Sequence, residues 1–150
     1  MTTDRTLLRI GEAAQLNHGG QRDEARLLLA AMWDEIGGEE GDPLYRCTLA
    51  HTMADTQDDA GAELLWDQRA LAAADLVTDA QLAQAGVPVS AAGLYPSLHL
   101  NLSECYRKLG DLGRAREHLR YAQDTIGALG DDDYGQLIRD GLERLTEQLR

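Results

Sequence analysis

The chain has 150 residues, enough for one domain that buries its own core without disulfides or metals. Its 26 acidic residues against 14 Lys and Arg give a net charge of −12. Such a surface repels nucleic acid and anionic membranes, because non-specific affinity for both comes mainly from Lys and Arg. The composition therefore disfavours nucleic-acid-binding and membrane-binding proteins and favours a partner that is neutral or basic.

Neither a signal-peptide core nor a stretch long enough to cross a membrane appears in the sequence, which predicts a cytoplasmic protein. Cys47 and Cys105 are the two cysteines, and this context predicts reduced thiols rather than a disulfide. Lys108 is the single lysine, while the other basic residues are arginines. With the abundant Ala and Leu, this usage is typical of a GC-rich bacterial genome.

Helix-forming residues dominate the chain, Phe is absent and β-branched residues are sparse, which predicts an all-α fold. Taken in chain order, seven helices are expected at about 4–17, 21–36, 42–56, 58–85, 94–109, 111–129 and 131–149. Val77-Thr78-Asp79 can interrupt the fourth helix before Ala80–Ala85.

The breaks between these segments carry helix start and stop signals. Gly19-Gly20 and Gly37-Gly38 are typical of helix C-termini. Asp42-Pro43 combines an N-cap with a proline in the first turn, and Asp58 or Asp59 and Asp111 are further N-cap candidates. In the last segment, helical spacing predicts one buried stripe, formed by Tyr134, Leu137, Ile138, Leu142, Leu145 and Leu149.

A repeated pattern of small, large and turn residues organises these segments. In its clearest copy His99, Leu102, Ser103 and Tyr106 precede the turn Gly110-Asp111, and Ala115 and Leu119 follow it. Looser copies contain Leu49, Ala50, Met53, Ala62 and Trp66, and earlier Ala13, Leu16, Gly20, Ala25 and Leu29. This pattern resembles the tetratricopeptide repeat, with His99 in place of its Trp, Leu119 in place of its Phe, and Arg9 and Glu12 as departures in the first copy.

The resemblance implies a single domain, residues 1–150, built of antiparallel helix hairpins stacked into a right-handed superhelix. The hairpins would span about 42–85 and 94–129 after a first at about 4–36, and the last helix, about 131–149, would cap the stack. It also implies a non-catalytic adaptor or scaffold that binds a protein or peptide on its concave face. Carried over to this chain, that face comprises Ile10, Ala14, Asn17, His18, Cys47, His51, Asp55, Leu100, Asn101, Glu104, Arg107 and Lys108.

The family's peptide sites often hold a terminal carboxylate with Lys, Arg and Asn, and Asn101, Arg107 and Lys108 would offer that chemistry here. An alternative is a small-molecule- or metal-responsive regulator, or a rare enzyme, built on helical repeats. Its support is the shared helix face of Cys47, His51 and Asp55 and the irregular segment 77–95, a candidate lid. Structural zinc sites normally need four ligands, so we predict no metal. Neither a G-x-S-x-G nor an H-E-x-x-H motif occurs in the sequence, so we also predict no catalytic residue and no cofactor.

Other conspicuous residues have structural interpretations. Trp33, Trp66 and Tyr121 are predicted to make core or inter-repeat contacts, and His18, His99 and His118 are predicted to be isolated structural residues. The acidic run at 39–42 is interpreted as a solvated connector, and the one at 131–133 as a solvated helix start. Apolar residues near the start of the chain leave self-association into a homo-oligomer open.

Overall fold

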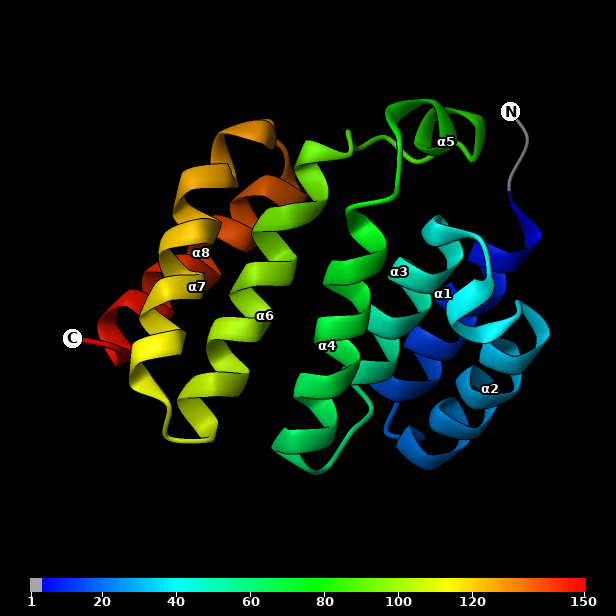
Figure 1. Ribbon diagram of the computed structural model, residues 1–150, viewed down its shortest axis with the longest axis horizontal. Helices are drawn as coiled ribbons and strands as arrows, with labels where there is room; N and C mark the ends of the chain where they lie inside the picture. The colour runs from blue at the N-terminus through cyan, green and yellow to red at the C-terminus, as the bar shows by residue number, and fades with distance from the viewer. Residues whose placement is uncertain (1–3) are drawn as a thin grey trace. The chain divides into compact units, whose positions relative to one another are not determined.

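The computed structural model describes residues 4–150, and within them every regular element is a helix (Figure 1). The all-α prediction is confirmed for this part of the chain. The α-helices are α1 (Arg5–His18), α2 (Arg22–Glu35), α3 (Pro43–Ala54), α4 (Ala60–Ala74), α5 (Asp79–Gln84), α6 (Tyr95–Lys108), α7 (Leu112–Thr125) and α8 (Asp133–Gln148). The 3-10 turns are η1 (Gly38–Glu40), η2 (Ala92–Leu94) and η3 (Ile126–Ala128). None of the helices within residues 4–150 is long and apolar enough to cross a membrane.

The chain divides into two compact units, the first ending at Pro88 and the second beginning at Val89. We expected one domain from the length of the sequence. The division falls directly after Gly86-Val87-Pro88, where glycine and proline end the helical pattern. Each unit contains a hydrophobic cluster of its own.

In the first unit α1 packs against α2, α3 packs against α4, and α3 also contacts both α1 and α2. The two helix pairs are therefore joined through α3. Their shared core consists of Ile10, Ala13, Leu29, Met32, Leu49 and Met53. Removing these side chains from water supplies the main driving force that holds the pairs together.

The segment after α4 is folded rather than an extension of that helix. The Thr78 hydroxyl accepts a hydrogen bond from Gln81 N at 3.2 Å, and the Gln81 side chain accepts one from Thr78 N at 3.0 Å. This reciprocal capping box starts α5 and produces an eighth helix where the sequence suggested an interrupted fourth. Leu82 of α5 is buried, and the helix belongs to the first unit.

In the second unit α7 runs antiparallel to α6, and α8 packs against both (Figure 1). Gly110 has φ 82° at the turn, a conformation that favours glycine, and Asp111 caps α7 by accepting a hydrogen bond from Arg114 N at 3.1 Å. Ser103 Oγ donates to the Ala115 carbonyl at 2.6 Å, and both residues are fully buried. The small side chains thus allow α6 and α7 to approach closely.

The apolar stripe of α8 is shorter than predicted. Ile138, Leu142, Leu145 and Leu149 are buried, but Tyr134 is 41% exposed and Leu137 is 60% exposed. Residue 137 lies one position, and so about 100° of helix rotation, away from Ile138. The buried side chains follow the i, i+4, i+7, i+11 spacing of one helix face, and that face covers Ala115, Leu119 and Ala122 of α7.

Candidate functional site

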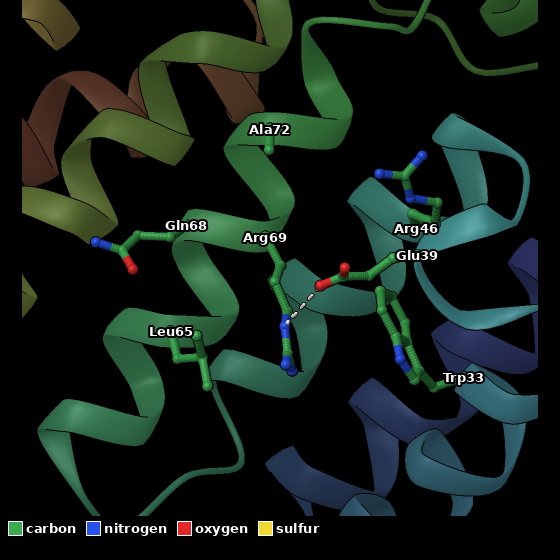
Figure 2. Close-up of a pocket in the computed structure, with 7 residues that line it drawn as sticks. All are labelled: Trp33, Glu39, Arg46, Leu65, Gln68, Arg69 and Ala72. Atoms are coloured by element: carbon green, nitrogen blue, oxygen red, sulfur yellow. Dashed lines mark ion pairs between the residues drawn. The ribbon is translucent and has the colours of Figure 1, made fainter.

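An open cavity of about 310 Å³ lies in the first unit. We name it the Arg–Trp pocket, and its lining residues, shown in Figure 2, are Trp33, Glu39, Arg46, Leu65, Gln68, Arg69 and Ala72. Four of these follow the i, i+3, i+4, i+7 spacing along α4, so they form one continuous helix face. Trp33 comes from α2, Glu39 from η1 and Arg46 from α3.

Aromatic contacts fix the position of Arg69 in this pocket. The rings of Trp33 and Trp66 meet edge to face, with centroids 5.2 Å apart at an interplanar angle of 90°. Arg69 Cζ lies 4.4 Å from the centroid of Trp66 and 6.0 Å from that of Trp33. Both distances lie within the range of a cation–π interaction, which holds the guanidinium in place without consuming its N–H donors. The predicted core role of the two tryptophans is thus extended, since Trp33 also lines a cavity.

Glu39 supplies the negative charge of the pocket. Its Oε1 lies 3.4 Å from Arg69 Nε, and Figure 2 shows the Arg69 side chain extending from α4 toward it. Glu39 sits on the three-residue turn η1, which Gly37 enters with φ 97° and Gly38 begins with φ 58°. From the sequence we interpret the acidic run at 39–42 as a solvated connector. In the structure the Glu39 carboxylate instead forms an ion pair with Arg69 across the pocket.

Arg46 presents a donor that the described residues do not satisfy. Its Nε is buried and has no hydrogen-bond acceptor within residues 4–150. No carboxylate in this part of the chain pairs with its guanidinium either. A buried N–H group without a partner costs free energy.

Two of the groove residues predicted in the first unit are joined at a helix junction. The Asn17 side chain, at the end of α1, donates to the Asp55 carbonyl at the end of α3, at 3.3 Å. His18 is exposed on the last turn of α1, and His51 is half-buried on α3. Burial lowers the pKa of His51, and the nearby charge of Asp55 partly offsets this effect.

Cys47 does not reach the surface, where it was predicted to line a groove. It is 4% exposed, and burial raises the pKa of its thiol to about 12. The thiol sulfur of Cys47, the imidazole nitrogens of His51 and the carboxylate oxygens of Asp55 do not lie close enough together to share one ion. Cys47 lies on the side of α3 that faces the neighbouring helices. The sequence spacing shows which residues share a face of the helix, but not which face is buried.

This burial predicts that Cys47 resists modification. A thiol with a raised pKa stays protonated at pH 8, and the thiolate is the reactive form. Cys105 is also buried, at 0% exposure. Iodoacetamide at pH 8 should therefore leave both thiols of the native protein unmodified over hours and alkylate both after denaturation, as counted by mass spectrometry. Rapid labelling of native Cys47 would contradict its placement in the core.

The predicted groove residues of the second unit lie partly under α8. Leu100 packs against the cluster of α7 and α8, and a Cβ built on Gly141 would come within 2.9 Å of Leu100 Cδ2. Asn101 and Glu104 line a cavity of about 260 Å³, and Arg144 of α8 is among its other lining residues. The glycine lets α8 approach the face of α6 that was expected to receive a partner.

The charge of Arg107 is already engaged within α6. Its Nε and one terminal nitrogen donate to the two carboxylate oxygens of Glu104, at 2.9 Å and 2.5 Å. Lys108 is exposed at the end of the helix. We expected Arg107 to attract a partner, but it would first have to leave its intrahelical ion pair with Glu104.

His99 and His118 are not isolated, although the sequence suggested so. Their Nδ1 atoms are 3.0 Å apart, with ring centroids at 5.3 Å and an interplanar angle of 25°. One ring therefore donates its Nδ1–H to the other nearly in plane, which links α6 to α7. Tyr121 lies beside both rings, at 5.2 Å and 5.6 Å. Burial lowers the pKa of His118, which favours the neutral form needed for this hydrogen bond.

Comparison of the chain with protein-family models, with curated proteins and with solved structures finds no match.

Proposed function

We propose that the chain is a non-catalytic module that binds a protein or peptide segment, and that the Arg–Trp pocket is its recognition site. One observation carries the proposal: two arginines from different helices and an indole ring border a single open cavity. Trp and Arg are enriched among the residues that dominate binding energy at protein interfaces. The available chemistry is hydrogen bonding, charge and stacking, which suits recognition.

The proposal includes tetratricopeptide-like stacking of the helices into a right-handed superhelix. The pairs α1/α2, α3/α4 and α6/α7 support it, since they correspond to the hairpins expected from the repeated pattern. The contact of α1 with α3 adds support, because stacked hairpins meet through their first helices. In this arrangement α8 caps the α6/α7 hairpin of the second unit.

Among the candidate surfaces, the Arg–Trp pocket is favoured over the predicted face of α6. Leu100 is half-buried against α7 and α8, and Arg107 forms an ion pair with Glu104. In contrast, Arg69 is held by an aromatic ring, and its carboxylate partner Glu39 has a side chain that is 68% exposed. Exposed ion pairs contribute only about 0–1 kcal/mol, so the pocket can open to a partner at little cost.

Affinity capture with matched variants tests the proposal. Wild type, Arg46→Gln/Arg69→Gln and the control Arg5→Gln/Arg120→Gln would each be immobilised, and bound proteins from the native cell extract quantified by mass spectrometry. The control removes the same charge from two exposed arginines that lie outside the pocket. A partner retained by wild type and control and lost from the pocket variant is expected. Equal retention by all three proteins, at unchanged melting temperatures, would contradict the proposed site.

A further inference from the structure

Positive charge is concentrated in the Arg–Trp pocket of an otherwise acidic unit. Residues 4–88 contain sixteen acidic side chains and six arginines, and two of these arginines line this one cavity. Three of the others form ion pairs elsewhere: Arg9 pairs with Glu35, and Arg22 and Arg26 pair with Asp58. The pocket therefore differs in sign from its surroundings, which points to an anionic group as its occupant.

We infer that the pocket receives an acidic side chain of a partner peptide, flanked by apolar residues, and that Glu39 is an internal competitor for the same arginine. This inference rests on the function proposed above and names the chemistry of the partner. The chain itself shows that a carboxylate fits, because Glu39 already occupies one side of the Arg69 guanidinium.

The contact that Glu39 makes leaves room for a better one. It is a single approach of 3.4 Å to Nε, whereas carboxylates often bind arginine through two parallel hydrogen bonds of about 2.7–2.9 Å. Because the Trp66 ring holds Arg69 independently, the guanidinium keeps its position when Glu39 leaves. An incoming carboxylate can therefore replace Glu39 without first ordering its binding site.

Arg46 provides a second reason for an anionic occupant. Its Nε is buried and so closed to an incoming group, but the positive charge of its guanidinium borders the same cavity as Arg69. Hydrogen bonds to charged groups contribute more to binding than neutral ones do. Two arginines from α3 and α4 together favour an anionic occupant that spans both helices.

The apolar part of the pocket indicates what flanks the acidic residue. Leu65 is 47% exposed, and it shares one face of α4 with Ala72 (Figure 2). The Trp33 ring lies on the same cavity. Exposed apolar groups next to charged donors suit a peptide in which leucine or an aromatic residue follows the acidic side chain.

The test uses hexapeptide pools, acetylated and amidated so that they carry no terminal charge. One pool has Glu followed by Leu at fixed positions, and the matched pool has Gln followed by Leu. Binding is measured through the fluorescence of Trp33 and Trp66, the two tryptophans of the chain. The proteins are wild type, Glu39→Gln, Glu40→Gln and Arg46→Gln/Arg69→Gln. Glu40→Gln is the matched control. Glu40 is exposed on the same turn as Glu39, and its substitution removes the same charge without removing a contact to Arg69.

For the Glu pool we expect Glu39→Gln to bind about two- to fivefold more tightly than wild type, as befits loss of an exposed ion pair. Glu40→Gln should stay within about twofold of wild type, since a single surface charge acts weakly in salt. Arg46→Gln/Arg69→Gln should lose at least about tenfold, because charge-assisted hydrogen bonds disappear. The Gln pool should bind weakly to every variant.

Equal gains in Glu39→Gln and Glu40→Gln would overturn the competitor role of Glu39. Equal binding of the Glu and Gln pools would overturn the acidic side chain as occupant. In either case, loss of the captured partner from the arginine variant would leave the proposed binding function standing. If no pool binds, the acidic-peptide inference is wrong. The capture experiment then tests separately whether the Arg–Trp pocket is a recognition site.

Discussion

Replacing Leu29 by alanine should lower the free energy of unfolding of the first unit by about 2–5 kcal/mol. Leu29 is 0% exposed and belongs to the cluster that joins the helix pairs α1/α2 and α3/α4. Truncation removes buried methyl groups and leaves a cavity that the surrounding side chains fill only partly. Urea unfolding followed by tryptophan fluorescence reports on this unit, because Trp33 and Trp66 both pack against that cluster.

Leu27 is the matched control for that experiment. It lies on the same helix, two positions away, and is 73% exposed. Leu27→Ala should therefore change the free energy of unfolding by no more than about 0.5 kcal/mol. Similar losses in both variants would mean that α2 does not turn the side of Leu29 toward the core.

Replacing Ala115 by leucine should destabilise the second unit by about 1–3 kcal/mol. Ala115 is fully buried where α7 meets α6, and its carbonyl receives the Ser103 hydroxyl at 2.6 Å. A larger side chain forces the two helices apart or into strained rotamers. Hydrogen exchange of the α6 and α7 amides measures the effect directly, since the chain carries no tryptophan in this unit.

Gly113→Ala provides the control in the same helix turn. A Cβ there would meet no atom closer than 3.8 Å, so it fits. Because alanine forms helices better than glycine, the variant should be neutral or slightly more stable. If Ala115→Leu exchanged as slowly as Gly113→Ala, the close contact of α6 and α7 would be misplaced.

Helix starts were the most predictable feature of this chain. Asp42, Asp59 and Asp111 were identified as N-cap candidates, and each accepts a hydrogen bond from a backbone N–H two or three residues later. Capping depends on a few consecutive residues, so the sequence contains the whole signal. The glycine turn before Asp111 was predictable for the same reason.

The Arg–Trp pocket could not be predicted in this way. Its arginines are 23 positions apart in the sequence, and they share a cavity only because α3 packs against α4. The spacing of Leu65, Gln68, Arg69 and Ala72 was a usable signal for one face of α4, but it does not say whether that face is covered. The role of Glu39 depends on the 3-10 turn η1, which a run of acidic and glycine residues does not specify.

The predicted groove was wrong at Ile10 and Cys47 for a common reason. Both positions were carried over from a repeat family, in which the first helix of a hairpin lines the concave face. In this chain Ile10 and Cys47 are both buried, whereas Leu100 is half-buried beside Gly141 and lines a cavity together with Asn101. Helical spacing identifies which residues share a face, whereas the packing partners of that face follow from the tertiary structure.

Site-specific photo-crosslinking tests most directly whether the partner binds at the Arg–Trp pocket. A benzophenone amino acid would replace Leu65 in the pocket, the matched exposed Leu27 outside it, or Lys108 on α6. After irradiation with the captured partner, we expect a covalent adduct from position 65 and little from positions 27 and 108. Adducts from position 108 with none from position 65 would contradict the pocket as the recognition site. They would indicate instead that the partner binds at α6.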